Sequence, residues 1–74
     1  MRPLEAEHQG WRIRVIAHPA GRAWSALVEV WAPATEGAEP RVVPFSATLP
    51  SEKLAQAAGR TAAARWIERE AKRS

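Results

Sequence analysis

The chain is 74 residues long, carries a formal net charge of +3, and contains no Cys, Asp, Asn or Tyr. Its length fits one domain, and the absence of Cys excludes both a disulfide and a zinc site built on thiolates. No apolar run approaches the roughly 18–20 residues that a membrane-spanning helix needs.

The composition and the first residues indicate where the protein acts. Ala, Arg, Pro and Gly make up 35 of the 74 residues, a bias typical of GC-rich bacterial genomes. Residues 1–10, MRPLEAEHQG, contain one Arg, two Glu and no apolar stretch, so they do not have the pattern of a signal peptide. We therefore expect a soluble bacterial protein that stays in the cytoplasm, and the absence of Cys agrees with that compartment.

A β-hairpin is the strongest pattern in the first half of the chain. Residues 1–10 are polar and contain one Pro and one Gly, so we expect a flexible lead-in. Residues 11–18 and 23–32 alternate between two faces with period two, which predicts two half-buried strands. The sequence Pro-Ala-Gly-Arg at residues 19–22 favours a tight turn between them. Together these segments predict a hairpin.

A third strand and a long helix follow the hairpin. Residues 33–40, PATEGAEP, have the composition of a loop. Residues 41–48 are predicted to form the third strand. Pro44 has no N–H to donate to a ladder, so either this strand lies at an edge of the sheet or its proline sits on the unpaired side. Ser51 is suited to act as the N-cap of a helix that runs to about residue 72.

These elements predict an α+β fold in which residues 11–72 form a single βββα domain. It is a three-stranded antiparallel β-meander with one C-terminal α-helix packed on one face. Gly59 borders the helix stripe expected to face the sheet, so a close contact there would explain a residue that costs a helix about 1 kcal/mol. Ile67 is an alternative to Trp66 as the anchor of the helix. The predicted core consists of Trp11, Ile13, Val15, Trp24, Ala26, Val28, Val30, Phe45, Leu54, Ala58, Ala62 and Trp66.

The sequence offers little material for catalysis or metal binding. It contains no Cys nucleophile, no Asp for a Ser-His-Asp triad and no Gly-rich phosphate loop. His8 lies in the predicted lead-in and His18 at a strand end, with no third ligand at a recognised metal-binding spacing. We therefore predict a protein that is not an enzyme and that has no catalytic residues, no cofactor and no metal site.

The sheet face turned away from the helix is the more informative surface. Strand alternation places on it a mixture of arginines, one Trp and several aliphatic residues, which is more apolar than an ordinary wet sheet face. The residues predicted on this face are Arg12, Arg14, Ile16, His18, Ser25, Leu27, Trp31 and Val42. Of these, we select as the candidate binding face Arg12, Arg14, His18, Leu27 and Trp31.

Three interpretations of this face remain open. The leading one is self-association as a homodimer or binding of a protein partner, because Trp and Arg are enriched at interfaces and a chain this short buries little surface alone. The alternative is binding of single-stranded DNA or RNA, with Trp31 stacked on a base and Arg12 and Arg14 on phosphates. The third is an ordinary sheet with some exposed apolar residues.

The excess positive charge lies in the last third of the chain. Residues 51–74 carry six Lys or Arg and three Glu, whereas the rest of the chain sums to zero. These cations could contact phosphate, but Glu68 is placed to pair with Lys72 and Glu70 interleaves with the basic residues, as on a solvated helix face. The sequence favours the solvated face.

The order of elements resembles that of known small bacterial proteins. Residues 21–28, Gly-Arg-Ala-Trp-Ser-Ala-Leu-Val, followed by Phe45 and an Ala-rich helix over residues 51–67, look like a group of uncharacterised bacterial proteins with this pattern. The βββα order is also similar to that of HicB-type antitoxins and of single-stranded-DNA-binding transcriptional coactivators, whose curved sheets bind nucleic acid as dimers. The resemblance implies a fold and a dimeric partner arrangement, and it carries over no site residue.

Overall fold

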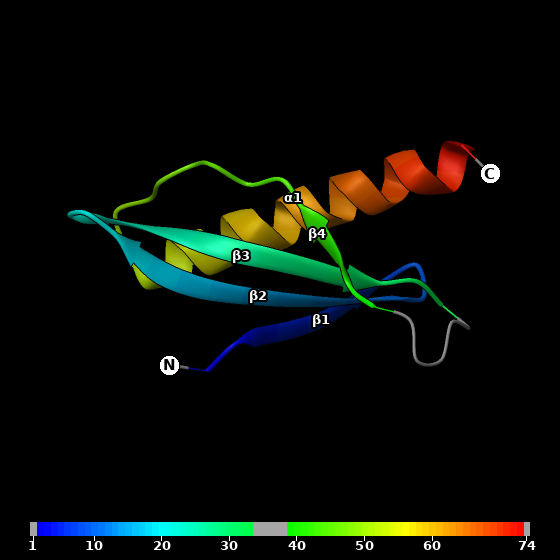
Figure 1. The fold of residues 1–74 in the computed structure, drawn as a ribbon, viewed down its shortest axis with the longest axis horizontal. Coiled ribbons are helices and arrows are strands. Elements are labelled where there is room, and N and C mark those ends of the chain that lie inside the picture. Colours follow the sequence, from blue (N-terminus) through cyan, green and yellow to red (C-terminus); the bar gives the residue numbers. More distant parts are fainter. Residues whose placement is uncertain (1, 34–38, 74) are drawn as a thin grey trace.

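The computed structural model describes residues 2–33 and 39–73, and it is an α+β fold with one antiparallel sheet and one C-terminal helix (Figure 1). The sheet has four strands in the order β1-β2-β3-β4. The elements are β1 (Leu4–His8), β2 (Trp11–Ala20), β3 (Ala23–Trp31), β4 (Arg41–Val43) and α1 (Glu52–Arg73). Most of the predicted loop, residues 34–38, lies outside the described residues.

Strand β1 corrects the prediction of a three-stranded sheet with a flexible lead-in. It pairs antiparallel with β2, with Leu4 opposite Val15 and His8 opposite Trp11. The two-residue turn between these strands has positive φ at Gln9 (51°) and Gly10 (84°). Two consecutive positive φ angles characterise the hairpin turn whose twist matches that of its strands. Gln at the first of these positions is unusual, which is why the turn is hard to recognise in the sequence.

The predicted hairpin is confirmed as β2 and β3. The register pairs Arg12 with Trp31 and continues to Ala20 opposite Ala23, so β2 extends two residues beyond its predicted end. Pro19 is inside β2 at a point that β1 does not reach, because β1 pairs only as far as Val15. A proline is tolerated there because its missing N–H interrupts no ladder on the unpaired side of the strand.

The third predicted strand is much shorter than expected. It ends at Val43 instead of residue 48, although β4 does form an edge of the sheet. Pro44 cannot donate to β3, and the chain leaves the ladder there. It returns only at Leu49, whose N–H and C=O both bond to the backbone of Trp24 at 2.8 Å. The strand therefore ends directly before Pro44, which agrees with the missing N–H of proline.

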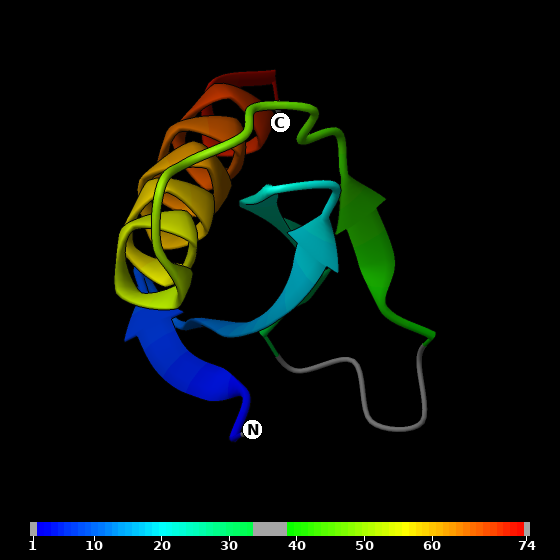
Figure 2. The same cartoon turned by 90° about the vertical axis from the view of Figure 1, so that its left-hand side faces the viewer.

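Helix α1 begins as the sequence predicts and covers one face of the sheet. Ser51 caps it, because its Oγ accepts a hydrogen bond from the Leu54 N–H at 3.2 Å. Viewed along the long axis, the sheet is curved and α1 lies against its inner side (Figure 2). Gly59 meets the sheet closely, since a Cβ built on it would lie 2.7 Å from Cγ1 of Val15. The predicted reason for this glycine is thus confirmed.

The predicted core is confirmed for the aliphatic residues of β2 and β3, and it is corrected for the aromatic residues and for the helix. The helix turns the row Ala55, Gly59, Ala63 and Ile67 toward the sheet, so Ile67 is fully buried whereas Leu54 is 50% exposed. Other predicted core residues are only partly buried, namely Trp11, Trp24, Phe45, Ala58, Ala62 and Trp66. The buried hydrophobic residues are Ile13, Val15, Ala17, Ala26, Val28, Val30, Val43, Ala55, Ala63 and Ile67.

The tryptophans of the predicted core lie at its rim. Trp11 and Trp66 meet edge to face, with ring centroids 5.7 Å apart and ring planes at 82°. The Arg41 guanidinium covers the Trp66 ring at 4.7 Å from its centroid. Large amphipathic rings often keep one edge in water, so small residues occupy the centre of this helix–sheet contact instead.

None of the helical segments that the structure describes is both long and apolar enough to cross a membrane.

Candidate interaction surface on the sheet

The strand register fixes which side chains share the sheet face turned away from α1, because directly paired residues lie on the same face. One row across the sheet runs from Glu5 through Arg14 and Glu29 to Val42. The neighbouring row consists of Glu7, Arg12 and Trp31. We call this surface the outer sheet face. Its residues are Glu5, Glu7, Arg12, Arg14, Ile16, His18, Ser25, Leu27, Glu29, Trp31 and Val42.

Three of the predicted binding residues form one cluster on this face. The guanidinium carbons of Arg12 and Arg14 lie 5.4 and 5.5 Å from the centroid of the Trp31 ring. Both distances are within the range of cation–π attraction, which contributes about 0.5–1 kcal/mol at exposed sites. Trp31 is half-buried, so part of its ring stays accessible on this face beside the two guanidinium groups.

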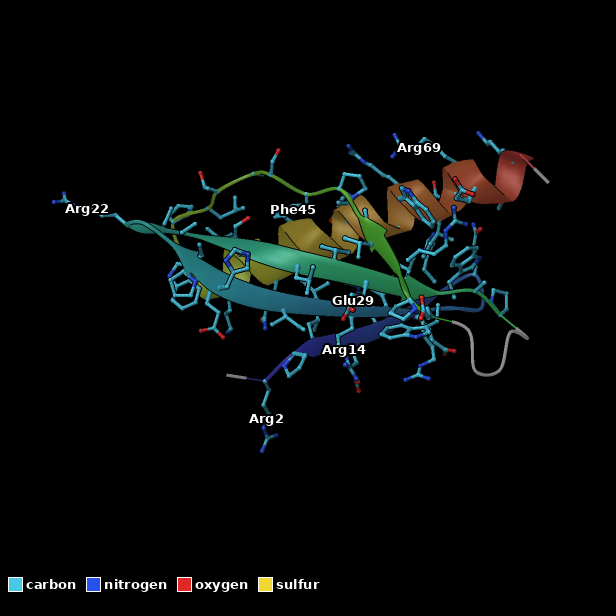
Figure 3. All side chains as sticks on the ribbon, in the orientation of Figure 1. Arg2, Arg14, Arg22, Glu29, Phe45 and Arg69 are labelled. Atoms are coloured by element: carbon cyan, nitrogen blue, oxygen red, sulfur yellow. The ribbon has the colours of Figure 1, made fainter. Side chains whose placement is uncertain are left out.

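Carboxylates surround these arginines. Arg14 Nη2 lies 3.5 Å from Glu5 Oε1, and Arg14 is also directly opposite Glu29 in the register. Figure 3 shows Arg14 and Glu29 on the side of the sheet away from the helix. A depression of about 380 Å³ lies between β1 and Trp31, lined by both signs of charge. The face as a whole carries two guanidinium groups and three carboxylates.

An apolar patch adjoins the charged cluster. Leu27 is 42% exposed and Val42 is 60% exposed, and both flank Glu29 on this face. Ile16, opposite Leu27 on β2, is half-buried and extends the patch. Exposed aliphatic side chains gain free energy when another surface covers them. The outer sheet face therefore combines an apolar patch with charges of both signs.

His18 is the predicted site residue that the structure keeps apart from the cluster. It lies six residues along β2 from Arg12, which is about 20 Å in an extended strand. Its ring Nδ1 lies 3.2 Å from the backbone oxygen of Pro19, its own neighbour. Ser25, opposite His18, is buried, and its hydroxyl donates to the Ala47 carbonyl at 2.9 Å. At this end of the face, the Ser25 hydroxyl therefore connects β3 to the segment that follows β4.

Sequence reasoning missed the two carboxylates of β1. Glu5 and Glu7 lie opposite Arg14 and Arg12, at positions that were assigned to a lead-in. The signal is present in the sequence Leu-Glu-Ala-Glu-His, which alternates apolar and charged residues and is followed by a glycine. Five residues are too few to distinguish such a strand from a polar tail without the register.

The described residues contain no group of three or more His, Cys, Asp or Glu side chains that could hold a metal ion. His8 and His18 lie on opposite faces of the sheet, since His8 pairs with Trp11 on the helix side and His18 with Ser25 on the other. The two histidines therefore cannot share a ligand. The expectation that the protein is not an enzyme and needs no cofactor stays a prediction.

Comparisons with protein-family models, with curated proteins and with solved structures found no match to this chain. The resemblance to HicB-type antitoxins and to the single-stranded-DNA-binding coactivators therefore stays a prediction.

Proposed function

We propose that this protein is a non-enzymatic interaction module whose partner is a second copy of the same chain, bound through the outer sheet face. The observation that carries the proposal is the placement of Glu29 and Arg14 side by side at the centre of that face, next to exposed Leu27 and Val42. A surface that holds both charges beside an apolar patch can complement itself across a two-fold axis.

The proposed dimer axis passes near the Arg14–Glu29 pair. In that arrangement Arg14 of each copy faces Glu29 of the other, and the Leu27 and Val42 side chains of both copies leave water. Charge pairing of this kind fixes orientation, whereas the apolar contacts supply most of the free energy. A chain of 74 residues without disulfides has reason to associate, because one small core provides limited stability.

Single-stranded nucleic acid is less well supported as the partner of this face. The three carboxylates outnumber the two guanidinium groups, and phosphate binding needs an excess of positive charge. Both arginines also lie over the Trp31 ring, where a base would have to stack. A labelled single-stranded oligonucleotide that bound tightly at low salt, and lost affinity in Trp31→Ala, would favour this alternative over self-association.

Trp31 is the expected anchor of the dimer. We expect Trp31→Ala to weaken the dimer about tenfold or more, because a half-buried ring beside two arginines is a typical interface anchor. The monomer should stay folded, since Trp31 is outside the buried core. Sedimentation equilibrium over a range of protein concentrations measures the dissociation constant, and circular dichroism checks the fold.

The matched control is Leu54→Ala, which removes an exposed apolar side chain from the opposite side of the molecule. It should leave the dissociation constant unchanged. A wild-type protein that sediments as a monomer at millimolar concentration would contradict the proposal, and so would a dimer that Trp31→Ala leaves intact.

A further inference from the structure

The acidic side chains in the second half of α1 are bound to the sheet on the two flanks of the helix. Glu68 accepts a hydrogen bond from Nε2 of His8 in β1 at 2.9 Å, instead of the expected pairing with Lys72. On the other flank, Glu70 accepts one from Arg41 of β4 at 3.4 Å. Both carboxylates therefore have a partner in the sheet.

The five cations of the helix whose side chains are described are all exposed: Lys53, Arg60, Arg65, Arg69 and Lys72. Figure 3 shows Arg69 extending from the helix on the side away from the sheet. We call this surface the basic helix face. It contrasts with the outer sheet face, where carboxylates outnumber guanidinium groups.

A groove runs beside this surface, between β1 and α1. Its volume is about 730 Å³, and the helix lines it with Lys53, Arg60 and Arg65 and with the small residues Ala57, Thr61 and Ala64. A second depression, of about 270 Å³, continues from it and adds Arg69 and Lys72. Glu68 is the carboxylate common to both. The cations thus follow one continuous track along the helix.

The dimensions of this track suit a phosphate backbone. From Lys53 to Lys72 the helix advances about 28 Å, and Arg65 and Arg69 are separated by about 6 Å along the axis. Each strand of a duplex presents one phosphate per about 3.4 Å of its axis, so several phosphates lie within that length. The small residues between the cations leave room for a backbone to approach closely. Guanidinium groups bind phosphate through paired N–H donors.

The residues that line the groove favour duplex nucleic acid over other anionic partners. Neither Trp nor Phe lines either hollow. Trp66 lines a separate depression together with Arg69 and Lys72, but the Arg41 guanidinium already covers its ring, so an unpaired base would find no free ring to stack on. The helix contributes no large apolar residue to the lining, which an amphipathic membrane-binding helix requires. The polar groups of Gln56 and Thr61 already bond to backbone carbonyls of Arg2 and Ala57, so they are engaged within the protein.

We propose that the basic helix face binds the phosphate backbone of double-stranded nucleic acid without reading its sequence. This goes beyond the proposed self-association and uses the opposite side of the molecule. A dimer formed through the outer sheet face would carry its two helices on its outer sides, both free to contact duplex. Failure of either proposal leaves the other intact, because separate residues carry them.

The test is fluorescence anisotropy with a labelled 20-base-pair duplex of mixed sequence. If all five cations contact phosphate, wild-type affinity should fall about 500-fold when salt rises fourfold, from 50 to 200 mM. Arg65→Gln/Arg69→Gln removes two contacts, so the same change in salt should reduce its affinity only about 40-fold. Gln preserves helix propensity, and circular dichroism checks the fold.

Arg2→Gln/Arg22→Gln is the matched control. It makes the same change in net charge at two exposed arginines whose side chains extend away from α1 (Figure 3). The contact of Arg2 with the helix is made by its backbone carbonyl, which the substitution keeps. The control should retain the wild-type salt dependence. The proposal would be overturned if the two double variants lost the same amount of duplex affinity, or if the wild-type protein did not bind duplex at 50 mM salt. It would also fail if a single strand of equal length, polyglutamate or anionic phospholipid vesicles bound more tightly than the duplex.

Discussion

Replacing Ile67 with alanine is expected to lower the free energy of unfolding by about 3 kcal/mol, which is a large share of the stability of so small a domain. Ile67 is fully buried and is among the largest side chains so enclosed. It fills the core where the last turns of α1 meet the sheet, in one cluster with Ile13 and Val30. Neighbouring strands are held by their ladders and cannot collapse into the space left behind.

Thermal or urea unfolding, followed by circular dichroism, measures this loss. A decrease of 3 kcal/mol corresponds to a fall in Tm of about 12–24 °C for a domain of this size. Ile67→Val should lower the free energy of unfolding by about 1 kcal/mol. This smaller loss can be measured even if the alanine variant is unfolded. Leu54→Ala, at a half-exposed position of the same helix, should cost much less. Similar losses at positions 54 and 67 would mean that the helix is rotated relative to the sheet.

The hairpin of β2 and β3 could be predicted because both of its strands alternate over many residues. Ile13 and Val15 on one strand, and Val28 and Val30 on the other, identify the buried face without any tertiary information. The same alternation placed Arg12, Arg14 and Trp31 on one surface, and the structure does bring these three side chains together.

The two edge strands could not be predicted to the same degree. Residues Leu4–His8 form a strand only because β2 supplies a ladder, and the carboxylates of Glu5 and Glu7 are typical of polar tails as well as of edge strands. In β4, three residues pair with β3 before Pro44 interrupts the ladder. A short edge strand depends on the neighbouring strand for its hydrogen bonds, so its own residues give only a weak signal that it is a strand.

The buried face of α1 was ambiguous for a different reason. Alanine occurs on every side of this helix, so the large residues Leu54 and Trp66 dominated the predicted stripe. Because the helix packs closely against a curved sheet, the row of its smallest residues, which contains Gly59, faces the sheet instead. Ile67 continues that row and is fully buried, whereas Trp66 is only partly buried, so the structure supports Ile67 over Trp66 as the anchor.

Gly59→Ala is expected to destabilise the protein by about 2 kcal/mol, although alanine favours a helix by about 1 kcal/mol over glycine. The added Cβ would lie 2.7 Å from Val15 Cγ1 and 3.2 Å from Val28 Cγ2. Both valines are fully buried, and their branched side chains have few alternative rotamers, so they cannot move aside. The helix must shift away from the sheet, and overpacking of this kind typically costs about 1–3 kcal/mol.

A double-mutant cycle with Val15→Ala separates the contact from the helix propensity. Removing the Val15 methyl groups makes room for the new Cβ, so the double variant should lose at least 1 kcal/mol less than the sum of the two single losses. Thr61→Ala, at an exposed position of the same helix, should raise stability by a few tenths of a kcal/mol, because the gain in helix propensity exceeds the loss of the exposed hydrogen bond from Thr61 Oγ1 to the Ala57 carbonyl. If Gly59→Ala stabilised the protein as Thr61→Ala does, the helix would not approach β2 and β3 this closely, and the glycine would have no packing role.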